Sequence, residues 1–199
     1  MSKPFTLTVS ATELLALTRT PHPLCILDGS FDLGTPDAAR QAFKETHIAG
    51  AQFADLDTHL SAHGEVAAIN AGRHPLPTRE WFAQQLGKWG IAPNTQVVVY
   101  DRNGNNFCGR AWWMLKWCGF EAVAVLDGGL AAWQASGGEL GSGPAPEPAQ
   151  PDRFQVCDPA VDNSQTNEMA RHLRNPLSTS CSRPLLQPTP INRYDSPAL

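Results

Sequence analysis

Residues 97–117 decide the fold of this chain: they read Val-Val-Val-Tyr-Asp (97–101), Arg-Asn-Gly-Asn-Asn (102–106) and Phe-Cys-Gly-Arg-Ala-Trp-Trp-Met-Leu-Lys-Trp (107–117). The apolar run predicts a buried strand, the polar run a turn-forming loop, and the aromatic-rich run a helix. In an open α/β sheet, ligands bind at the carboxyl ends of the strands, where helix N-termini point. We therefore expect any functional pocket at the loop headed by Asp101.

Further strands and helices alternate on both sides of this stretch. A capping box of Ser10 and Glu13 begins one predicted helix and Thr78 begins another. Residues 32–42 are polar and predict a loop followed by a helical turn, whereas residues 63–77 predict an irregular excursion. Apolar strands that alternate with helices are typical of a parallel sheet covered on both faces. The expected fold is α/β with about five strands (6–9, 24–29, 47–53, 97–100 and 123–126) and further helices at 10–18, 79–89, 105–119 and 130–136.

Composition excludes several classes of protein. The chain has 199 residues, of which 42% are hydrophobic and 17% charged, and a net charge of −4 without a basic stripe. This balance argues against nucleic acid or an anionic membrane as the main partner. No signal peptide and no apolar run of ~20 residues is present, so we expect a cytoplasmic protein. The cysteines are odd in number and widely spaced, which favours reduced thiols over disulfides or a zinc site: Cys25, Cys108, Cys118, Cys157 and Cys181.

Domain organisation follows from a change of composition after Gly137. Residues 5–138 carry all the alternating strands and helices and predict one domain. Residues 139–156 are rich in glycine and proline and predict a linker. Residues 157–199 predict the remnant of a second domain, with a short helix at 163–173, followed by a proline- and serine-rich tail. That tail has too little apolar surface to offset its ordering entropy, so we expect disorder.

Several motifs in the first domain resemble those of the rhodanese family. The family signature is an aromatic residue, three further residues and then His-Ile-Pro-Gly-Ala; here alanine replaces the proline. The domain is similar to the N-terminal domain of two-domain sulfurtransferases, which include thiosulfate and 3-mercaptopyruvate sulfurtransferases. The matching residues are Phe43, His47-Ile48-Ala49-Gly50-Ala51, His-Pro-Leu-Pro (74–77), Val-Val-Val-Tyr-Asp (97–101), Arg-Ala-Trp-Trp-Met-Leu (110–115), and Val-Leu-Asp-Gly-Gly-Leu (125–130) with Trp133.

The resemblance implies transfer of sulfane sulfur from a small anionic donor through a cysteine persulfide. That cysteine heads the loop after the fourth strand, where backbone N–H groups and a helix N-terminus stabilise the thiolate. In the two-domain members only the C-terminal copy carries it. Asp101 stands at this position here, and a carboxylate carries no sulfur and repels anions. We therefore expect no catalytic residue and no cofactor in this chain, and its substrate-binding residues remain unassigned.

The second domain of such a protein is expected after the linker, but the pattern stops. After Asn175 no strand closes on Asp-Ala-Arg, no second His-x-Pro-Gly-Ala turn occurs, and no loop begins with cysteine. The chain therefore resembles a C-terminally truncated member of the family. Codons for Ser180-Cys181-Ser182, shifted by one base, can encode three leucines, which suggests a frameshift near Leu177. Reading the coding DNA in the other two frames tests that hypothesis.

The remaining thiols and aromatic residues have ordinary structural explanations. Cys108 lies near a helix N-terminus, which favours a thiolate, but its neighbours favour a buried packing role. Cys25 and Cys118 lie in apolar runs and are expected in the core, whereas Cys157 and Cys181 fall outside the domain and are expected to be incidental. Five of the six tryptophans lie on two predicted helices. We expect their side chains either in the hydrophobic core or on a face that packs against another domain.

The polar residues of the domain also have structural explanations. Arg110 suits anion binding, yet we favour an ion pair with Asp101 or Asp127. Residues 102–106 hold one glycine and lack phosphate-loop spacing, so a plain turn is expected. His47 is expected to hydrogen-bond locally rather than act as a base. Three other histidines lie in loops without metal-ligand spacing, so no metal site is expected: His59, His63 and His74.

Two functions remain open from the sequence. In one, the chain belongs to the sulfurtransferase family and is its non-catalytic N-terminal domain, inactive by itself. In the other, it is a catalytically silent rhodanese module that serves as a scaffold or binding domain. Self-association through a face left without its second domain is a further expectation.

Overall fold

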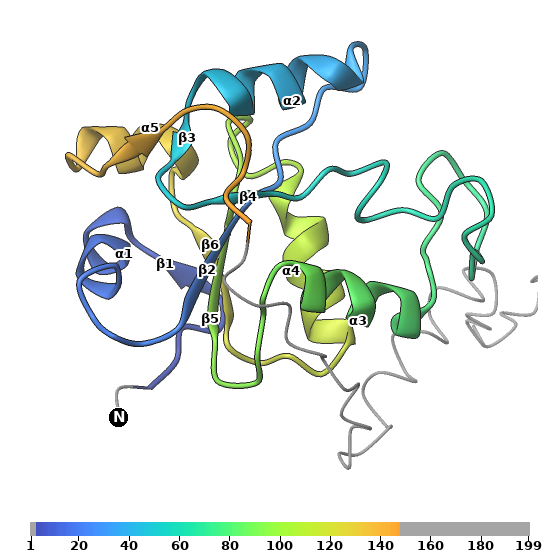
Figure 1. Cartoon of the computed structure of the whole chain (residues 1–199), viewed down its shortest axis with the longest axis horizontal. Helices are drawn as coiled ribbons and strands as arrows, with labels where there is room; N and C mark the ends of the chain where they lie inside the picture. Colours follow the sequence, from blue (N-terminus) through green and yellow to red (C-terminus); the bar gives the residue numbers. More distant parts are fainter. Residues whose placement is uncertain (1–2, 148–199) are drawn as a thin grey trace, which may run out of the picture. The chain divides into compact units, whose positions relative to one another are not determined.

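Five strands pair in the order β1–β6–β5–β2–β4, and every pairing is parallel (Figure 1). The computed structural model describes residues 3–147. A separate antiparallel pair joins β3 to β7. The strands are β1 (Thr8–Val9), β2 (Leu24–Asp28), β3 (His47–Ile48), β4 (Gln52–Phe53), β5 (Gln96–Tyr100), β6 (Val123–Leu126) and β7 (Leu140–Gly141).

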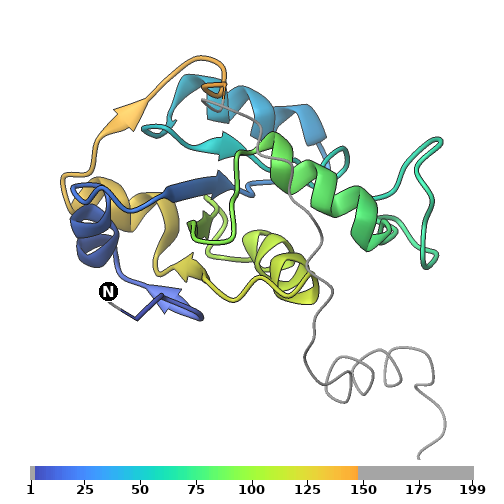
Figure 2. The same cartoon turned by 60° about the horizontal axis from the view of Figure 1, so that its bottom comes forward.

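The central strand β5 divides the core into two clusters, because successive side chains of a strand point to opposite faces. Val97 and Val99 pack with α3 and α4, whereas Val98 and Tyr100 pack with α1, α2 and α5. The two sets of helices lie on opposite sides of the sheet in both views (Figures 1 and 2). The helices are α1 (Ala11–Leu17), α2 (Pro36–Glu45), α3 (Arg79–Lys88), α4 (Cys108–Trp117) and α5 (Gly129–Ala135). The predicted α/β fold is confirmed.

Two predicted helix starts are confirmed in atomic detail. Ser10 and Glu13 form the capping box of α1, each side chain bonding the other residue's backbone N–H. The Thr78 hydroxyl accepts a hydrogen bond from the backbone N–H of Trp81 and so caps α3. Gly90 follows α3 with φ +68°, a left-handed conformation that ends a helix at little cost when the residue is glycine.

Two helix boundaries differ from the prediction. Helix α2 has ten residues where a loop and a helical turn were expected. Its buried core contacts come from Ala39 and Phe43, which lie four residues apart on one face of the helix. Two apolar positions among mostly polar neighbours are too few to predict an amphipathic helix. Helix α4 begins at Cys108 rather than at Asn105, because the backbone N–H groups of Asn103, Asn105 and Phe107 bond a side chain instead of forming a helical turn.

The start of the predicted linker is part of the folded domain. Leu140 and Gly141 form β7 and pair with Ile48 and His47 of β3. The indole N–H of Trp133 donates to the carbonyl of Glu139 at 2.9 Å. Ordered contacts therefore continue past residue 138. Residues 148–156 of the linker, the predicted helix at 163–173, the tail, Cys157 and Cys181 lie outside the described residues.

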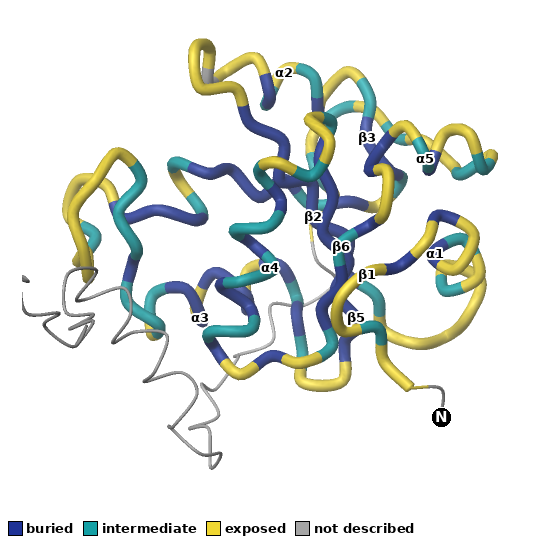
Figure 3. Tube along the Cα trace, turned by 180° about the vertical axis from the view of Figure 1, so that it is seen from behind, coloured by how far each residue is buried: buried dark blue, intermediate teal, exposed yellow. Residues whose placement is uncertain are grey.

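The central strands of the parallel sheet are almost entirely buried (Figure 3). All five residues of β5 are buried, as are four of the five residues of β2. Three buried polar residues, Asp28, Ser30 and Asp101, lie where these two strands end. Within residues 3–147, no helix is long and apolar enough to cross a membrane. The carboxyl edge of the sheet is therefore the place to examine for function.

Candidate functional site

Asp101 follows β5 directly, and its carboxylate is enclosed by backbone N–H groups. One oxygen, Oδ1, accepts hydrogen bonds from the N–H of Asn103 and of Asn105, both at 2.8 Å. The other, Oδ2, accepts from the N–H of Phe107 at 2.8 Å and of Cys108 at 3.0 Å. The side chain is 1% exposed. The loop therefore converges four donors on a single buried anionic group.

This arrangement is a backbone anion cradle that the chain fills with its own carboxylate. Two of the donors come from Phe107 and Cys108, at the start of α4, where the unpaired N–H groups and the helix dipole favour negative charge. Gly104 and Asn105 have φ values of +70° and +66°, and these left-handed residues turn the loop around the carboxylate. An external anion has no access to these donors while Asp101 accepts from them.

The beginning of α5 closes over the same loop. The N–H of Leu130 donates to the backbone carbonyl of Asp101 at 3.3 Å. At Gly129, which has φ +55°, an added Cβ would lie 2.3 Å from that carbonyl oxygen. Only glycine fits such a close approach. The Gly-Gly pair after β6 is thus part of the architecture that holds the Asp101 loop.

Cys108 is a packed core residue, as expected. It is 0% exposed, and a Cβ added at Gly29 would lie 3.0 Å from its Cα. Burial, and then the neighbouring Asp101 carboxylate, raise the pKa of the Cys108 thiol far above its ordinary value. Cys25 and Cys118 are also buried free thiols, and burial raises the pKa of each to about 12. None of these three thiols ionises near neutral pH.

Arg110 does not form the predicted ion pair with Asp101 or Asp127. Its guanidinium donates instead to backbone carbonyls: to Leu60 from Nε at 3.0 Å and from Nη2 at 2.8 Å, and to His74 from Nη2 at 3.1 Å. A further contact reaches the Pro75 carbonyl at 3.4 Å. The prediction failed because these acceptors are backbone atoms of a distant loop. Residues 54–78, between β4 and α3, form one excursion from the sheet, and Arg110 clamps its two limbs onto α4.

The loop residue Arg102 also has a structural role. Its guanidinium donates to the carbonyl of Thr46 and lies 3.6 Å from Oδ2 of the fully buried Asp28. Its backbone N–H donates to the Ser30 hydroxyl at 3.1 Å. These contacts tie the loop to the neighbouring strand end, as a structural turn requires.

His47 is held locally, as expected. Its Nδ1 lies 2.7 Å from the carbonyl of Phe43, and its ring stacks on the Phe43 ring with centroids 4.1 Å apart. Gly141 of β7 passes close to the same ring, and an added Cβ there would lie 2.9 Å from Nε2. The histidine of the family turn thus fixes the geometry between α2 and the β3–β7 pair.

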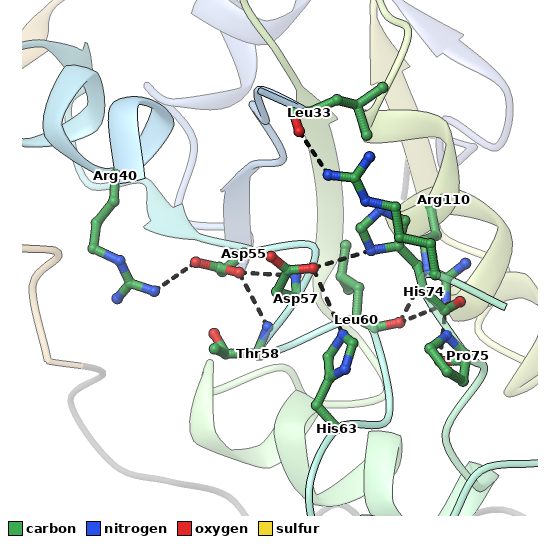
Figure 4. A network of polar contacts seen from close by, with 11 residues as sticks. Leu33, Arg40, Asp55, Asp57, Thr58, Leu60, His63, His74, Pro75 and Arg110 are labelled. Carbon is green, nitrogen blue, oxygen red and sulfur yellow. Dashed lines mark hydrogen bonds and ion pairs between the residues drawn. The ribbon is translucent and has the colours of Figure 1, made fainter. Parts of the chain in front are cut away.

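The structure brings together two of the three loop histidines. His63 and His74 converge on Asp57, and their potential ligand atoms lie within 4.8 Å of one another (Figure 4). His59 is separate: its Nδ1 accepts from the N–H of Asp55 at 3.1 Å, and burial lowers its pKa. Asp57 was not among the residues predicted to be functional. Its position just after a predicted strand was the available signal, since strand ends share one edge of the sheet.

Two groups at this edge of the sheet differ in what they can do chemically. The Asp101 carboxylate is sealed by its donors. The Asp57–His74 pair is partly buried, with the imidazole Nδ1 3.0 Å from the carboxylate Oδ1. A carboxylate next to an imidazole can orient the ring, and the two groups together can bind a cation.

Comparisons with known proteins agree with the geometry. The family model of the rhodanese-like domain matches residues 10–136. The Probable 3-mercaptopyruvate sulfurtransferase of Pseudomonas aeruginosa is 40% identical over 166 residues, which cover 80% of this chain and 57% of the relative. Thiosulfate/3-mercaptopyruvate sulfurtransferase 1, mitochondrial, of Arabidopsis thaliana is 41% identical over 137 residues, which cover 67% of this chain and 34% of the relative.

Among solved structures, the chain superposes on SseA from Escherichia coli, a 3-mercaptopyruvate sulfotransferase, with a TM-score of 0.62 and 29% identity. The match covers 85% of this chain and 64% of the SseA chain. The chain thus spans about half the length of the curated relatives it matches. These relatives are sulfurtransferases, and residues 10–136, which the family model matches, include four of the five strands of the parallel sheet and the Asp101 loop. This chain belongs to the rhodanese family.

Proposed function

We propose that residues 3–147 are the non-catalytic domain of a rhodanese-family sulfurtransferase, and that the 199-residue chain transfers no sulfur by itself. The observation that carries this proposal is the Asp101 carboxylate, which occupies all four N–H donors of the cradle. In this family the resemblance puts a persulfide cysteine at that place. The domain keeps the backbone architecture of the cradle without its nucleophile.

The chemistry of the transfer explains why this substitution matters. A thiolate must attack the outer sulfur of thiosulfate or the thiol sulfur of 3-mercaptopyruvate. A new S–S bond forms while the donor's own S–S or C–S bond breaks, and sulfite or the enolate of pyruvate leaves. An acceptor such as cyanide then takes the outer sulfur of the persulfide and releases the thiolate. A carboxylate is too weak a nucleophile for this step. Cys108 lies seven residues further on, but its thiol is fully buried and its pKa is raised. A buried neutral thiol is inert in such an exchange.

Thiosulfate or 3-mercaptopyruvate is the proposed sulfur donor of the intact protein. The relatives' names support both donors, since one refers to 3-mercaptopyruvate and another to both compounds. Both donors are small anions, and their binding requires a cradle that a carboxylate does not already fill. The donor site is therefore expected outside the Asp101 loop.

The experiment is a sulfur-transfer assay on the purified chain. It is incubated with thiosulfate or 3-mercaptopyruvate plus cyanide, and thiocyanate is measured for the wild type, Cys108→Ser and Asp101→Cys. We expect no thiocyanate above the blank from the first two. Asp101→Cys is expected to take up one sulfur atom, seen by mass spectrometry and removed by cyanide, because the cradle stabilises a thiolate.

Three outcomes contradict the proposal. Wild-type turnover that disappears in Cys108→Ser makes Cys108 a catalytic nucleophile. An Asp101→Cys variant that folds, shows a reactive thiol towards a neutral reagent and takes up no sulfur shows that the loop is not a persulfide cradle. Turnover that survives in Cys108→Ser requires another cysteine of the chain, which Cys157→Ser and Cys181→Ser identify.

A silent binding module is the second candidate. Trp81, Trp113 and Trp117 on α3 and α4 are only partly buried, and the last two stack with ring centroids 5.7 Å apart. Half-buried tryptophans are typical of surfaces that receive a partner. Self-association through this face predicts a concentration-dependent size in light scattering, which Trp113→Gln abolishes. The cytoplasmic location and the lack of nucleic-acid and membrane partners remain predictions.

A further inference from the structure

The 54–78 excursion gathers two imidazoles and a carboxylate. Asp57 lies near the start of the excursion, His63 follows a few residues later, and His74 returns near its end (Figure 4). Their side chains are 33%, 48% and 17% exposed, respectively. The group is therefore partly buried and still open to solvent on the His63 side.

The spacing of the three ligand atoms suits a tetrahedral cation. Asp57 Oδ1 lies 3.0 Å from His74 Nδ1 and 3.6 Å from His63 Nε2. A tetrahedral zinc ion with bonds of about 2.0 to 2.1 Å needs ligand atoms about 3.3 Å apart. The two observed distances bracket that value. The third pair lies within 4.8 Å, and a small rotation of the exposed His63 side chain brings it into range.

The His74 ring has unused bonding capacity. Neither of its buried ring nitrogens has a hydrogen-bond partner among the described residues. Nδ1 approaches the Asp57 carboxylate within 3.0 Å, yet the contact lacks hydrogen-bond geometry. Buried polar atoms in native proteins are usually paired, so an unpaired one calls for an unseen partner. A cation placed between nitrogen and carboxylate supplies such a partner.

The scaffold holds the two limbs together and engages the neighbouring arginine side chains with other partners. Arg110 bonds the carbonyls of Leu60 and His74, and so fixes the backbone before His63 and at His74 itself. These acceptors occupy its guanidinium. Arg73, next to His74, donates to the carbonyl of Leu33 at 2.6 Å and is thereby directed elsewhere. The site is thus preorganised, and its nearest arginines already have partners.

We propose that Asp57, His63 and His74 form a binding site for a divalent transition metal, with zinc as the best match. Two imidazoles favour zinc, nickel, copper or cobalt over magnesium or calcium, which prefer oxygen ligands. Three protein ligands leave one coordination position for water or a small anion, as in open zinc sites. Binding displaces any protons on the imidazoles and cross-links the two ends of the excursion.

Metal binding is tested on the metal-free full-length chain by titration with Zn²⁺ against a chromogenic chelator. We expect one equivalent bound, and at least a tenfold loss of affinity in each of Asp57→Asn, His63→Ala and His74→Ala. His22→Ala, at an exposed histidine outside the cluster, is the matched control and retains wild-type affinity. Circular dichroism confirms that each variant folds.

Cobalt distinguishes this site from the cysteines of the chain. Co²⁺ bound by two nitrogens and an oxygen gives visible d–d bands without the ultraviolet charge-transfer band of a cobalt–thiolate bond. A charge-transfer band, binding that Cys157→Ser and Cys181→Ser remove, or a Zn²⁺ affinity unchanged in the Asp57, His63 and His74 variants overturns the proposal. None of these readouts depends on sulfur transfer, so they leave the proposed function untouched.

Discussion

Replacing Asp101 by asparagine measures how strongly the chain stabilises its own anion cradle. The carboxylate accepts four backbone hydrogen bonds, two on each oxygen, and is 1% exposed. Asparagine keeps one acceptor oxygen and places an NH₂ group against two N–H donors. Two hydrogen bonds to a charged acceptor are lost, each contributing about 1.5 kcal/mol. We expect the free energy of unfolding to fall by roughly 3 kcal/mol.

The matched control is Asp32→Asn. Asp32 also accepts backbone N–H groups, from Gly34 and Thr35, both at 2.8 Å. Both bonds go to Oδ1, and the residue is exposed. Asparagine can therefore keep both bonds, and the expected loss is below about 0.5 kcal/mol.

Urea unfolding followed by tryptophan fluorescence gives both free energies, and equal m-values confirm that the same surface is exposed. A difference of less than about 1 kcal/mol between the two variants would refute the reasoning. In that case the four donors are satisfied without the negative charge, and the loop is an ordinary turn rather than an anion cradle.

Three further variants test the surroundings of this loop. In Gly129→Ala the free energy of unfolding is expected to fall by about 3 kcal/mol or more, because the added Cβ would lie 2.3 Å from a backbone oxygen at a position with positive φ. In the control Gly109→Ala, where the added Cβ has open space within a helix, the free energy of unfolding is expected to rise by up to about 1 kcal/mol. Arg110→Met leaves backbone carbonyls without donors and costs about 2 kcal/mol, whereas exposed Arg19→Met costs less than about 0.5 kcal/mol. Burial lowers the pKa of His59 in the folded state, so below pH 6.5 the unfolded state binds a proton that the folded state does not, and the wild type loses stability. This loss of stability is expected to be smaller in His59→Gln.

Urea titrations measure the first two, and a pH series from 5 to 8 measures the third. Equal stabilities of Gly129→Ala and Gly109→Ala contradict the close approach of α5 to the Asp101 carbonyl. An Arg110→Met variant as stable as Arg19→Met shows that the clamp is dispensable. A wild-type stability that rises as the pH falls from 7 to 5, or a slope unchanged in His59→Gln, contradicts the buried neutral imidazole.

Much of this fold is encoded in local pattern. The apolar run of β5, the capping residues Ser10 and Thr78, and the glycine after α3 act on their immediate neighbours, so a single sequence reveals them. The position of Asp101 at a strand end follows from the same pattern. In contrast, the length of α2 depends on two core contacts spaced four residues apart, which are too few to stand out among polar neighbours.

The sequence by itself determined the α/β fold and the rhodanese family, and it predicts that Asp101 stands where the family carries its nucleophile. Tertiary structure decided what surrounds that position: four N–H donors enclose the carboxylate, and Arg110 bonds carbonyls up to fifty residues away instead of an aspartate. It also brought Asp57, His63 and His74 together from the two limbs of one excursion. Such contacts depend on how loops return to the edge of the sheet, and spacing along the chain does not encode that path.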